Sequence, residues 1–225
     1  MISVVIPTLN AAEVIGPTLG SLSPAIFDPV LTEVIISDGG STDDIEALAG
    51  ATGATLIRGE ASRGRQLAAG AAAARGEWLL FLHADTRLSE DWVKAACRHI
   101  GSRADRAGWF RLAFDADGFA PRFVAGWANL RSRWCALPYG DQGLLIHRDL
   151  YRAVGGYPDQ PLMEDVALAR QLGRRRMAPL DAVATTSAAR YARQGWVRRG
   201  ARNLMTLLRY FLGASPENLA AAYRR

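Results

Sequence analysis

Short apolar runs rich in β-branched residues alternate with amphipathic segments along the first hundred residues. The apolar runs predict strands, and the segments between them predict helices. The predicted strands are 3–6, 33–37, 55–58 and 78–82, and the predicted helices are 13–22, 43–51, 66–74 and 88–100. This alternation predicts an α/β domain with a mainly parallel central sheet flanked by helices, whose ligands bind beyond the carboxyl ends of the strands.

The pattern is less regular after residue 100. Strands are predicted at 109–115 and 143–147, and helices at 119–134 and 162–172. Arginines then interleave with large apolar residues over 190–212, which predicts a basic amphipathic helix. Two interpretations of this helix stay open, because its apolar face can pack on the domain or lie on an anionic membrane surface.

Length and composition predict one globular domain. The chain has 225 residues, of which 49% are hydrophobic and 22% charged. Its most nearly membrane-spanning stretch, Asn203 to Ala214, is shorter than the roughly 18 residues of a membrane span and contains Arg209. The first residues lack the features of a secretory signal. Cys97 and Cys135 are far apart, so we expect neither a disulfide scaffold nor a zinc site, and a cytoplasmic location.

The basic charge is carried almost entirely by arginine. The net charge is +5, and Lys94 is the only lysine. Arginine suits phosphate, because its planar guanidinium donates two hydrogen bonds at once. Nucleic acid, an anionic membrane or a phosphorylated ligand could use this charge. Acidic residues dominate the predicted cleft, however, so we expect no nucleic-acid partner.

Polar residues follow three of the predicted strands. Thr8 and Asn10 follow the first strand, Asp38 ends the second, and Asp85 follows the fourth. Because parallel strands present their carboxyl ends at one edge of the sheet, we expect these side chains to converge there. Helix capping or turn formation is the alternative reason for such residues.

Four motifs occur in an informative order along the chain. They are VVIPTLN (4–10), ISDGGSTDD (36–44), FLHADT (81–86) and LMEDVALARQL (162–172), the last preceded by GGYP (155–158). Over residues 1 to about 175 this arrangement resembles the family 2 glycosyltransferases, which have the GT-A fold. With YGDQG and RYARQGW added, the whole chain is similar to a bacterial group of that family linked by genomic setting to arsenosugar biosynthesis.

The resemblance implies a nucleotide-diphosphate-sugar donor, most simply a UDP-sugar, and a divalent metal, Mg²⁺ or Mn²⁺. Asp85 would bind the metal, while His83 replaces the first acid of the family's D-x-D motif. A metal held by one carboxylate can neutralise the departing diphosphate. The residues implied on the donor side are Pro7, Thr8, Asn10, Asp38, Gly39, Arg65 and His83.

The resemblance also implies the catalytic side of the site. Asp165 would be the general base that deprotonates the acceptor hydroxyl, and Glu164 would orient the acceptor or support the site. The residues expected to face or support the acceptor are Trp109, Gly140, Asp141, Gln142, Glu164 and Arg190. Arg190 would supply positive charge in place of a histidine that the family often has after the base.

The sequence therefore predicts a metal-dependent, inverting glycosyltransferase. Residues 1–100 would bind the nucleotide sugar, residues 101–190 would bind the acceptor and catalyse transfer, and residues 191–225 would form the basic helical segment. Peripheral contact with the inner face of the membrane stays open. The alternatives are a sugar nucleotidyltransferase and a noncatalytic protein that binds nucleotide sugar or a membrane.

Overall fold

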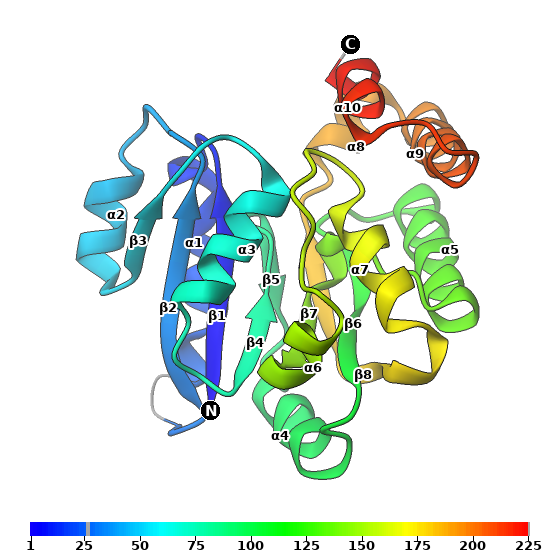
Figure 1. The fold of residues 1–225 in the computed structure, drawn as a ribbon. Coiled ribbons are helices and arrows are strands. Elements are labelled where there is room, and N and C mark those ends of the chain that lie inside the picture. Colours follow the sequence, from blue (N-terminus) through cyan, green and yellow to red (C-terminus); the bar gives the residue numbers. More distant parts are fainter. Residues whose placement is uncertain (26–27, 225) are drawn as a thin grey trace.

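The computed structural model describes residues 1–25 and 28–224, which form one β-sheet with helices on both faces (Figure 1). The strands of the sheet lie in the order β3-β2-β1-β4-β7-β6-β8-β5. Their bounds are β1 Ile2–Thr8, β2 Leu31–Asp38, β3 Thr55–Arg58, β4 Trp78–Phe81, β5 Thr86–Leu88, β6 Ala107–Phe114, β7 Leu144–His147 and β8 Met177–Thr186.

The first four strands form the parallel half of the sheet. β1 pairs in parallel with β2 on one side and with β4 on the other, and β2 pairs in parallel with β3. The register sets Thr8 opposite Asp38, so β1 and β2 end side by side. This confirms the predicted parallel strands within residues 1–82 and brings the loops after β1 and β4 to one edge.

The second half of the sheet is mixed, whereas parallel pairing predominates in the first half, as predicted. β7 is antiparallel to both β4 and β6, and β5 is antiparallel to β8, while β6 and β8 are parallel. β8 escaped prediction because it is built largely from alanine and threonine and contains Pro179. In the structure its buried and less buried residues alternate for most of its length, as expected of a strand.

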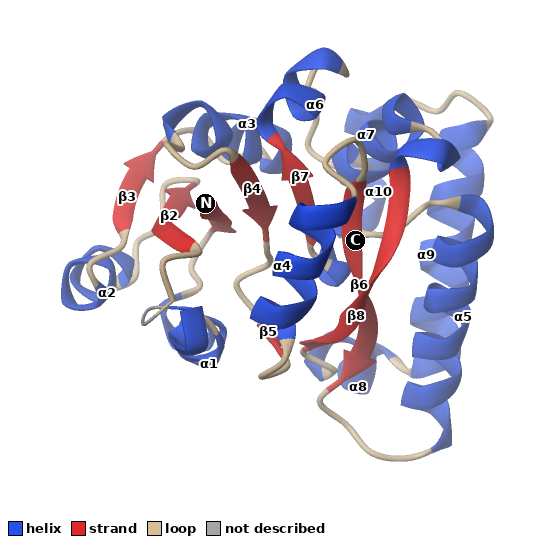
Figure 2. Ribbon diagram, turned by 90° about the horizontal axis from the view of Figure 1, so that it is seen from below, coloured by secondary structure: helices blue, strands red, loops and turns tan. Residues whose placement is uncertain are grey.

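Helices cover the two faces of the sheet (Figure 2). The α-helices are α1 Ala12–Ser21, α2 Ile45–Thr52, α3 Arg63–Ala73, α4 Trp92–Ser102, α5 Phe119–Cys135, α6 Arg148–Ala153, α7 Glu164–Leu172, α8 Ala189–Gln194, α9 Trp196–Phe211 and α10 Pro216–Arg224. The helix predicted from Leu88 begins only at Trp92, because Thr86–Leu88 pairs with β8. Among the described residues, no helix combines the length and apolar character needed to cross a membrane.

The core has two layers because consecutive strand residues point to opposite faces. Val4 and Ile6 of β1 pack in the layer that contains Trp92 of α4, whereas Val5 packs in the layer that contains Leu67 of α3. β1 is thus buried on both sides, as its continuous apolar run predicts.

The predicted helix over 190–212 is two helices. α8 and α9 meet at Gly195, whose φ of 81° lies in the left-handed region that favours glycine. Residue 225, the last of the expected C-terminal segment, lies outside the described residues.

Candidate active site

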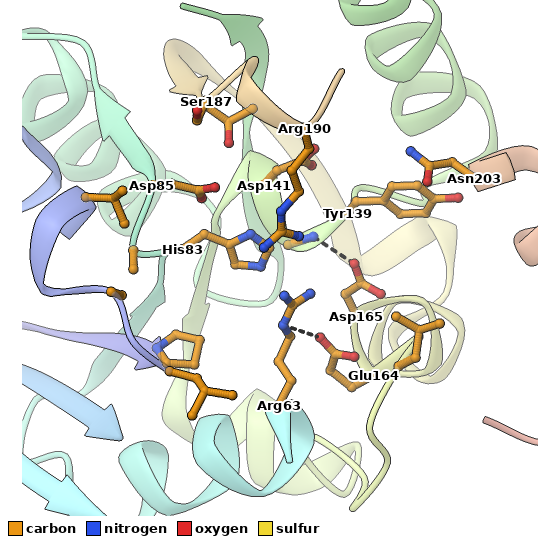
Figure 3. Close-up of a pocket in the computed structure, with 18 of the residues that line it drawn as sticks. Arg63, His83, Asp85, Tyr139, Asp141, Glu164, Asp165, Ser187, Arg190 and Asn203 are labelled. Atoms are coloured by element: carbon orange, nitrogen blue, oxygen red, sulfur yellow. Dashed lines mark hydrogen bonds and ion pairs between the residues drawn. The ribbon is translucent and has the colours of Figure 1, made fainter. Parts of the chain in front are cut away.

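A pocket of about 300 Å³ opens where β1 and β4 end (Figure 3). Its walls come from the loops after these strands, the start of α3, the turn before β7, the start of α7 and the C-terminal helices. The polar residues that line it are Asn10, Arg63, His83, Asp85, Tyr139, Asp141, Glu164, Asp165, Thr186, Ser187, Arg190, Tyr191, Asn203 and Tyr223. Four carboxylates and two arginines therefore face one hollow.

The structure brings most of the predicted site residues together. Asp85 and Asp165 are 80 positions apart in the chain, yet both line this pocket. The predicted residues found there are Pro7, Asn10, His83, Asp85, Gly140, Asp141, Glu164, Asp165 and Arg190. Their roles stay predictions, but the shared pocket that those roles require is present.

Asp38 and Thr8 do not line the pocket. The Thr8 hydroxyl donates to Asp38 Oδ1 at 2.9 Å, and Asp38 Oδ2 accepts from the backbone N–H groups of Gly40 and Ser41 at 3.0 and 2.8 Å. Burial alone would raise the pKa of Asp38, but the hydrogen bonds from Ser41, Thr8 and Gly40 together lower it. This carboxylate ties the end of β1 to the turn after β2, and its contact with a base stays a prediction.

Gly39, also expected on the donor side, is buried next to this network. A Cβ added there would lie 3.1 Å from the Gln66 side chain and from the Ala61 backbone. The Gln66 amide donates to the carbonyl oxygens of Thr8 and Ser37 at 2.7 and 2.8 Å. The close approach that this glycine permits is therefore to the protein's own side chain, which joins the ends of β1 and β2.

Arg63, and not the predicted Arg65, faces the pocket. Arg65 is half exposed and pairs with Glu60 and with Asp159, whose Oδ2 lies 2.8 Å from Arg65 Nε. Arg63 Nε lies 3.7 Å from Glu164 Oε1, and the nearby charges of Glu164, Asp165 and Asp85 raise its pKa against the effect of burial. The two residues diverge because positions two apart on a helix point in nearly opposite directions.

Trp109 and Gln142 correct two further expectations. Trp109 is only 4% exposed and belongs to the core on the α3 side of the sheet, so its ring offers no face to a sugar. Gln142 is fully buried, accepts from the Ser132 hydroxyl at 2.6 Å and donates to the Phe110 carbonyl at 3.2 Å. Both side chains hold the interior together and do not reach the pocket.

The first two residues of α7 present adjacent carboxylates to the pocket. Met163, with a φ of 63°, turns the chain immediately before them. Asp165 Oδ2 accepts from the Gly140 backbone N–H at 2.8 Å, and Oδ1 accepts from the Val166 N–H at 2.7 Å. Each oxygen keeps a further lone pair for a ligand. The Asp165 carboxylate is thus held in position while it can still accept a proton.

Glu164 is buried beside Asp165 and is incompletely satisfied. Its side chain is 2% exposed, and Oε2 has no hydrogen-bond partner. Burial, followed by the charge of Asp165, raises the pKa of Glu164 to about 7, while Arg63 opposes this rise. Burial thus favours the protonated form of this carboxyl relative to that of an exposed glutamate.

Asp85 and Asp141 offer oxygen ligands on the other side of the pocket (Figure 3). Asp141 Oδ1 is buried without a hydrogen-bond partner, and burial, with the charges of Asp165 and Asp85, raises the pKa of Asp141 to about 6. Carboxylate oxygens are the ligands that Mg²⁺ and Mn²⁺ favour. Three or more His, Cys, Asp or Glu side chains do not gather around one point in the described chain, so a metal here would need further ligands from a diphosphate and water.

His83 packs directly against Gly140. A Cβ on Gly140 would lie 2.3 Å from His83 Nε2, so the close contact requires glycine. Burial and the positive charges of Arg63 and Arg190 lower the pKa of His83 well below its usual value. The imidazole is therefore neutral at physiological pH and adds no charge to the pocket.

Sequence reasoning missed a polar cluster that the C-terminal helices contribute. Asn203 of α9 donates to the Tyr191 hydroxyl and accepts from the Tyr223 hydroxyl, both at 2.9 Å, and Arg199 donates to Tyr223 as well. All but Arg199 line the pocket. The apolar pattern of the sequence does not identify Asn203 as a site residue. Its hydrogen-bond partners become its neighbours only when α8, α9 and α10 pack together.

Comparison with known proteins identifies the family of this chain. The family described as "Glycosyl transferase family 2" matches residues 3–134. Glucosyl-3-phosphoglycerate synthase of Mycolicibacterium paratuberculosis is 37% identical over 93 residues, which cover 37% of this chain and 28% of that protein. The corresponding protein of Mycobacterium tuberculosis is 36% identical over the same share of each chain. The matched segment thus spans less than a third of these relatives.

Solved structures confirm the predicted GT-A fold. Residues 1–349 of TarS from S. aureus, solved with UDP-GlcNAc, align with a TM-score of 0.64 at 19% identity over 82% of this chain and 58% of that one. Glucosyl-3-phosphoglycerate synthase from Mycobacterium tuberculosis, solved with Mg²⁺ and UDP, aligns with a TM-score of 0.60 at 21% identity over 83% of this chain and 69% of that one. Similarity at this level of identity establishes the fold.

Proposed function

Because this chain belongs to glycosyl transferase family 2, we propose that its pocket transfers a sugar from a nucleotide-diphosphate donor to an acceptor hydroxyl. The observation that carries the proposal is the meeting of Asp85 and Asp141 with Glu164 and Asp165 in one pocket. One pair suits a cation beside a diphosphate, and the other suits removal of a proton from an alcohol.

Asp165 is the general base of this proposal. Its carboxylate is fixed by the N–H groups of Gly140 and Val166, so it need not reorganise when an acceptor hydroxyl approaches. The position at the start of α7 adds the favourable field of the helix N-terminus. The acceptor oxygen then attacks the anomeric carbon from the side opposite the diphosphate, and the sugar changes its anomeric configuration.

Glu164 supports the base in this scheme. When its carboxyl carries the proton that a pKa of about 7 allows, it can donate a hydrogen bond to a sugar or acceptor oxygen. Its unpartnered Oε2 is the atom available for that bond. Arg63 forms an ion pair with the other oxygen of this carboxyl, Oε1. It thereby holds Glu164 in place and brings positive charge into the pocket.

Asp85 and Asp141 would hold the divalent metal. The buried Asp141 Oδ1, which has no hydrogen-bond partner, supports this assignment because a metal would give it one. A bound Mg²⁺ or Mn²⁺ would neutralise charge on the leaving diphosphate. Arg63 and Arg190 add two cations on the same hollow, and they suit the remaining phosphate oxygens. Asp38 is saturated by the protein, so base recognition by this carboxylate would require it to exchange an existing hydrogen bond.

The donor is a UDP-sugar in this proposal, supported by the UDP and UDP-GlcNAc complexes of proteins with the same fold. The relatives act, by name, in glucosyl-3-phosphoglycerate synthesis, so a phosphorylated hydroxy acid is one acceptor to test. The link to arsenosugar biosynthesis stays a prediction and adds a second acceptor. We also propose that residues 1–100 bind the donor, that residues 101–190 bind the acceptor, and that a C-terminal segment follows. A cytoplasmic location is a further proposal.

Thermal unfolding with nucleotide sugars, with and without Mg²⁺ or Mn²⁺, tests the donor and the metal together. A ligand that binds the native state raises the unfolding temperature, so a UDP-sugar should stabilise the protein more when the metal is present. Asp85→Asn should abolish the increment that depends on metal while leaving unfolding without ligand near that of wild type. Stabilisation by UDP-sugar that is identical with and without metal in both proteins would contradict the metal site.

Asp165→Asn tests the base. Transfer should fall by about 10²- to 10⁴-fold, because the amide cannot take the proton, while donor affinity stays unchanged. Asp159→Asn, which alters an exposed acid outside the pocket, is the matched control and should keep its activity. Parallel loss of affinity and rate in Asp165→Asn would mean a structural role, and tight binding without turnover in the wild type would favour the noncatalytic alternative.

A further inference from the structure

Two neighbouring helices present unpartnered apolar rows to solvent on the flank farthest from β3. α5 and α9 contact each other, and both figures place them together on this side of the molecule (Figures 1 and 2). On α5 the exposed large residues recur every three or four positions, which sets them on one face: Phe119, Phe123, Trp127, Leu130 and Trp134. Phe119 is 82% exposed and Trp134 is 64% exposed.

α9 repeats the arrangement. Its exposed residues Val197, Leu204, Leu208 and Phe211 are spaced by seven, four and three positions, so they too share one face. The side of α9 that faces the domain carries the buried Thr206 and Leu207 and the pocket residue Asn203. Packing on the domain therefore uses one side of α9 and leaves an apolar row exposed, so contact of that row with a membrane stays a prediction.

Exposed arginines accompany both rows. On α9, Arg198, Arg202 and Arg209 are spaced by four and seven positions and share a second face, where Arg202 and Arg209 also line a groove against α10. On α5, Arg122 and Arg133 are exposed. Helices α5 and α9 contain neither aspartate nor glutamate, and their exposed arginines include Arg122, Arg133, Arg198 and Arg209. The flank is therefore both apolar and positively charged.

We propose that this α5–α9 face binds the surface of an anionic lipid bilayer. Exposed Trp, Phe and Leu beside arginines is the composition of helices that lie in the membrane interface, where rings enter the boundary of the acyl chains and guanidinium groups meet lipid phosphates. A second copy of the chain is disfavoured as the occupant, because two such faces would bring like charges together. The proposal does not depend on the reaction assigned to the pocket.

The face is connected to the pocket through the same helices. Arg190 and Tyr191 of α8 and Asn203 of α9 line the pocket, while the exposed row of α9 faces away from it. A bilayer bound at this face would lie beside the C-terminal wall of the pocket. The acceptor side of the protein would thus be held near the membrane surface.

Co-sedimentation with lipid vesicles tests the proposal on the full chain. The protein should bind vesicles of phosphatidylglycerol and phosphatidylcholine mixed one to two, should bind pure phosphatidylcholine far more weakly, and should be released as salt is raised. Arg198→Gln combined with Arg209→Gln should weaken partitioning by about 25-fold, since each basic residue near the surface contributes roughly fivefold. Phe123→Ser combined with Trp127→Ser should weaken it by at least about tenfold.

The matched control is Arg103→Gln combined with Arg152→Gln, which removes the same charge from exposed positions after α4 and in α6. It should bind vesicles within about twofold of wild type if charge position matters, as it does within a Debye length of a bilayer. All variants change exposed residues, and unchanged thermal unfolding verifies that they are folded.

Three results would overturn the proposal. The first is no binding of wild-type protein to the anionic vesicles at low salt. The second is an equal loss of binding in the Arg103/Arg152 control, which would show attraction by net charge alone. The third is a lipid-free dimer in analytical ultracentrifugation that dissociates in the Phe123/Trp127 variant, which would make a second copy the occupant of the face.

Discussion

Asp38 and Glu164 are both buried acids near the same edge of the sheet, yet their environments have opposite effects. Asp38 is surrounded by donors, namely the hydroxyls of Thr8 and Ser41 and two backbone N–H groups, and its pKa is lowered. Glu164 has one distant arginine, the like charge of Asp165 and an unpartnered oxygen, and its pKa is raised to about 7.

The contrast shows that burial by itself does not decide what an acid does. Burial disfavours the charged form of both carboxyls, but only Asp38 receives enough hydrogen bonds to reverse that effect. A saturated carboxylate stabilises the fold, because its donors would be unsatisfied without it. A carboxyl with an unpartnered oxygen can still form a hydrogen bond with a ligand. Glu164 in the pocket wall has this capacity, whereas Asp38 at the end of β2 does not.

Asp38→Asn should produce the largest stability change. The amide can accept fewer of the four hydrogen bonds and turns its own N–H groups toward other donors, so the free energy of unfolding should fall by about 3 kcal/mol. Because the folded pKa is lowered, this stability is present above the unfolded pKa and is lost as pH falls through the folded value. Urea unfolding measures the change. Asp44→Asn, an exposed acid on the same loop, should change it by less than about 0.5 kcal/mol.

Glu164→Gln should give a smaller effect of the opposite sign. The carboxyl has an ordinary pKa of 4.5 and a folded pKa of about 7, so wild-type stability falls as pH rises between these values. The variant lacks this loss, and its stability relative to wild type should increase by on the order of 2 kcal/mol between about pH 5 and about pH 8. Thermal unfolding at the two pH values tests this, and a difference that is independent of pH would contradict the raised pKa.

Arg63→Gln and Arg65→Gln should have different effects on the affinity for UDP with Mg²⁺, because the two side chains lie on different sides of α3. This is the smallest of the expected effects. Loss of the pocket cation should weaken binding of UDP with Mg²⁺ by about tenfold, as expected for one charge-assisted hydrogen bond. Arg65 engages only exposed acids, so its removal should alter affinity by less than about twofold. Isothermal titration calorimetry compares them, and equal losses would restore Arg65 as the phosphate ligand.

The fold was predictable where local pattern and burial agree. The continuous apolar runs of β1 and β4 and the polar residues after them identify buried strands that end at a site, and those elements are confirmed. β8 was not predicted, because alanine and threonine carry little apolar signal of their own and its strand character comes from pairing with β6 and β5. The mixed direction of the sheet likewise follows from pairing between distant segments.

The chain's own order of motifs determined the family, the α/β architecture and the two groups of acids that meet in the pocket. Such information is local, since a strand end, a glycine turn or a helix start is written in a few neighbouring residues. Only the tertiary structure decided that Arg63 faces the pocket instead of Arg65, that Trp109 is buried, that Asp38 is saturated, and that Asn203 joins Tyr191 and Tyr223. These outcomes depend on which distant side chains become neighbours. Those neighbours provide the hydrogen bonds and charges that determine the chemistry of each group.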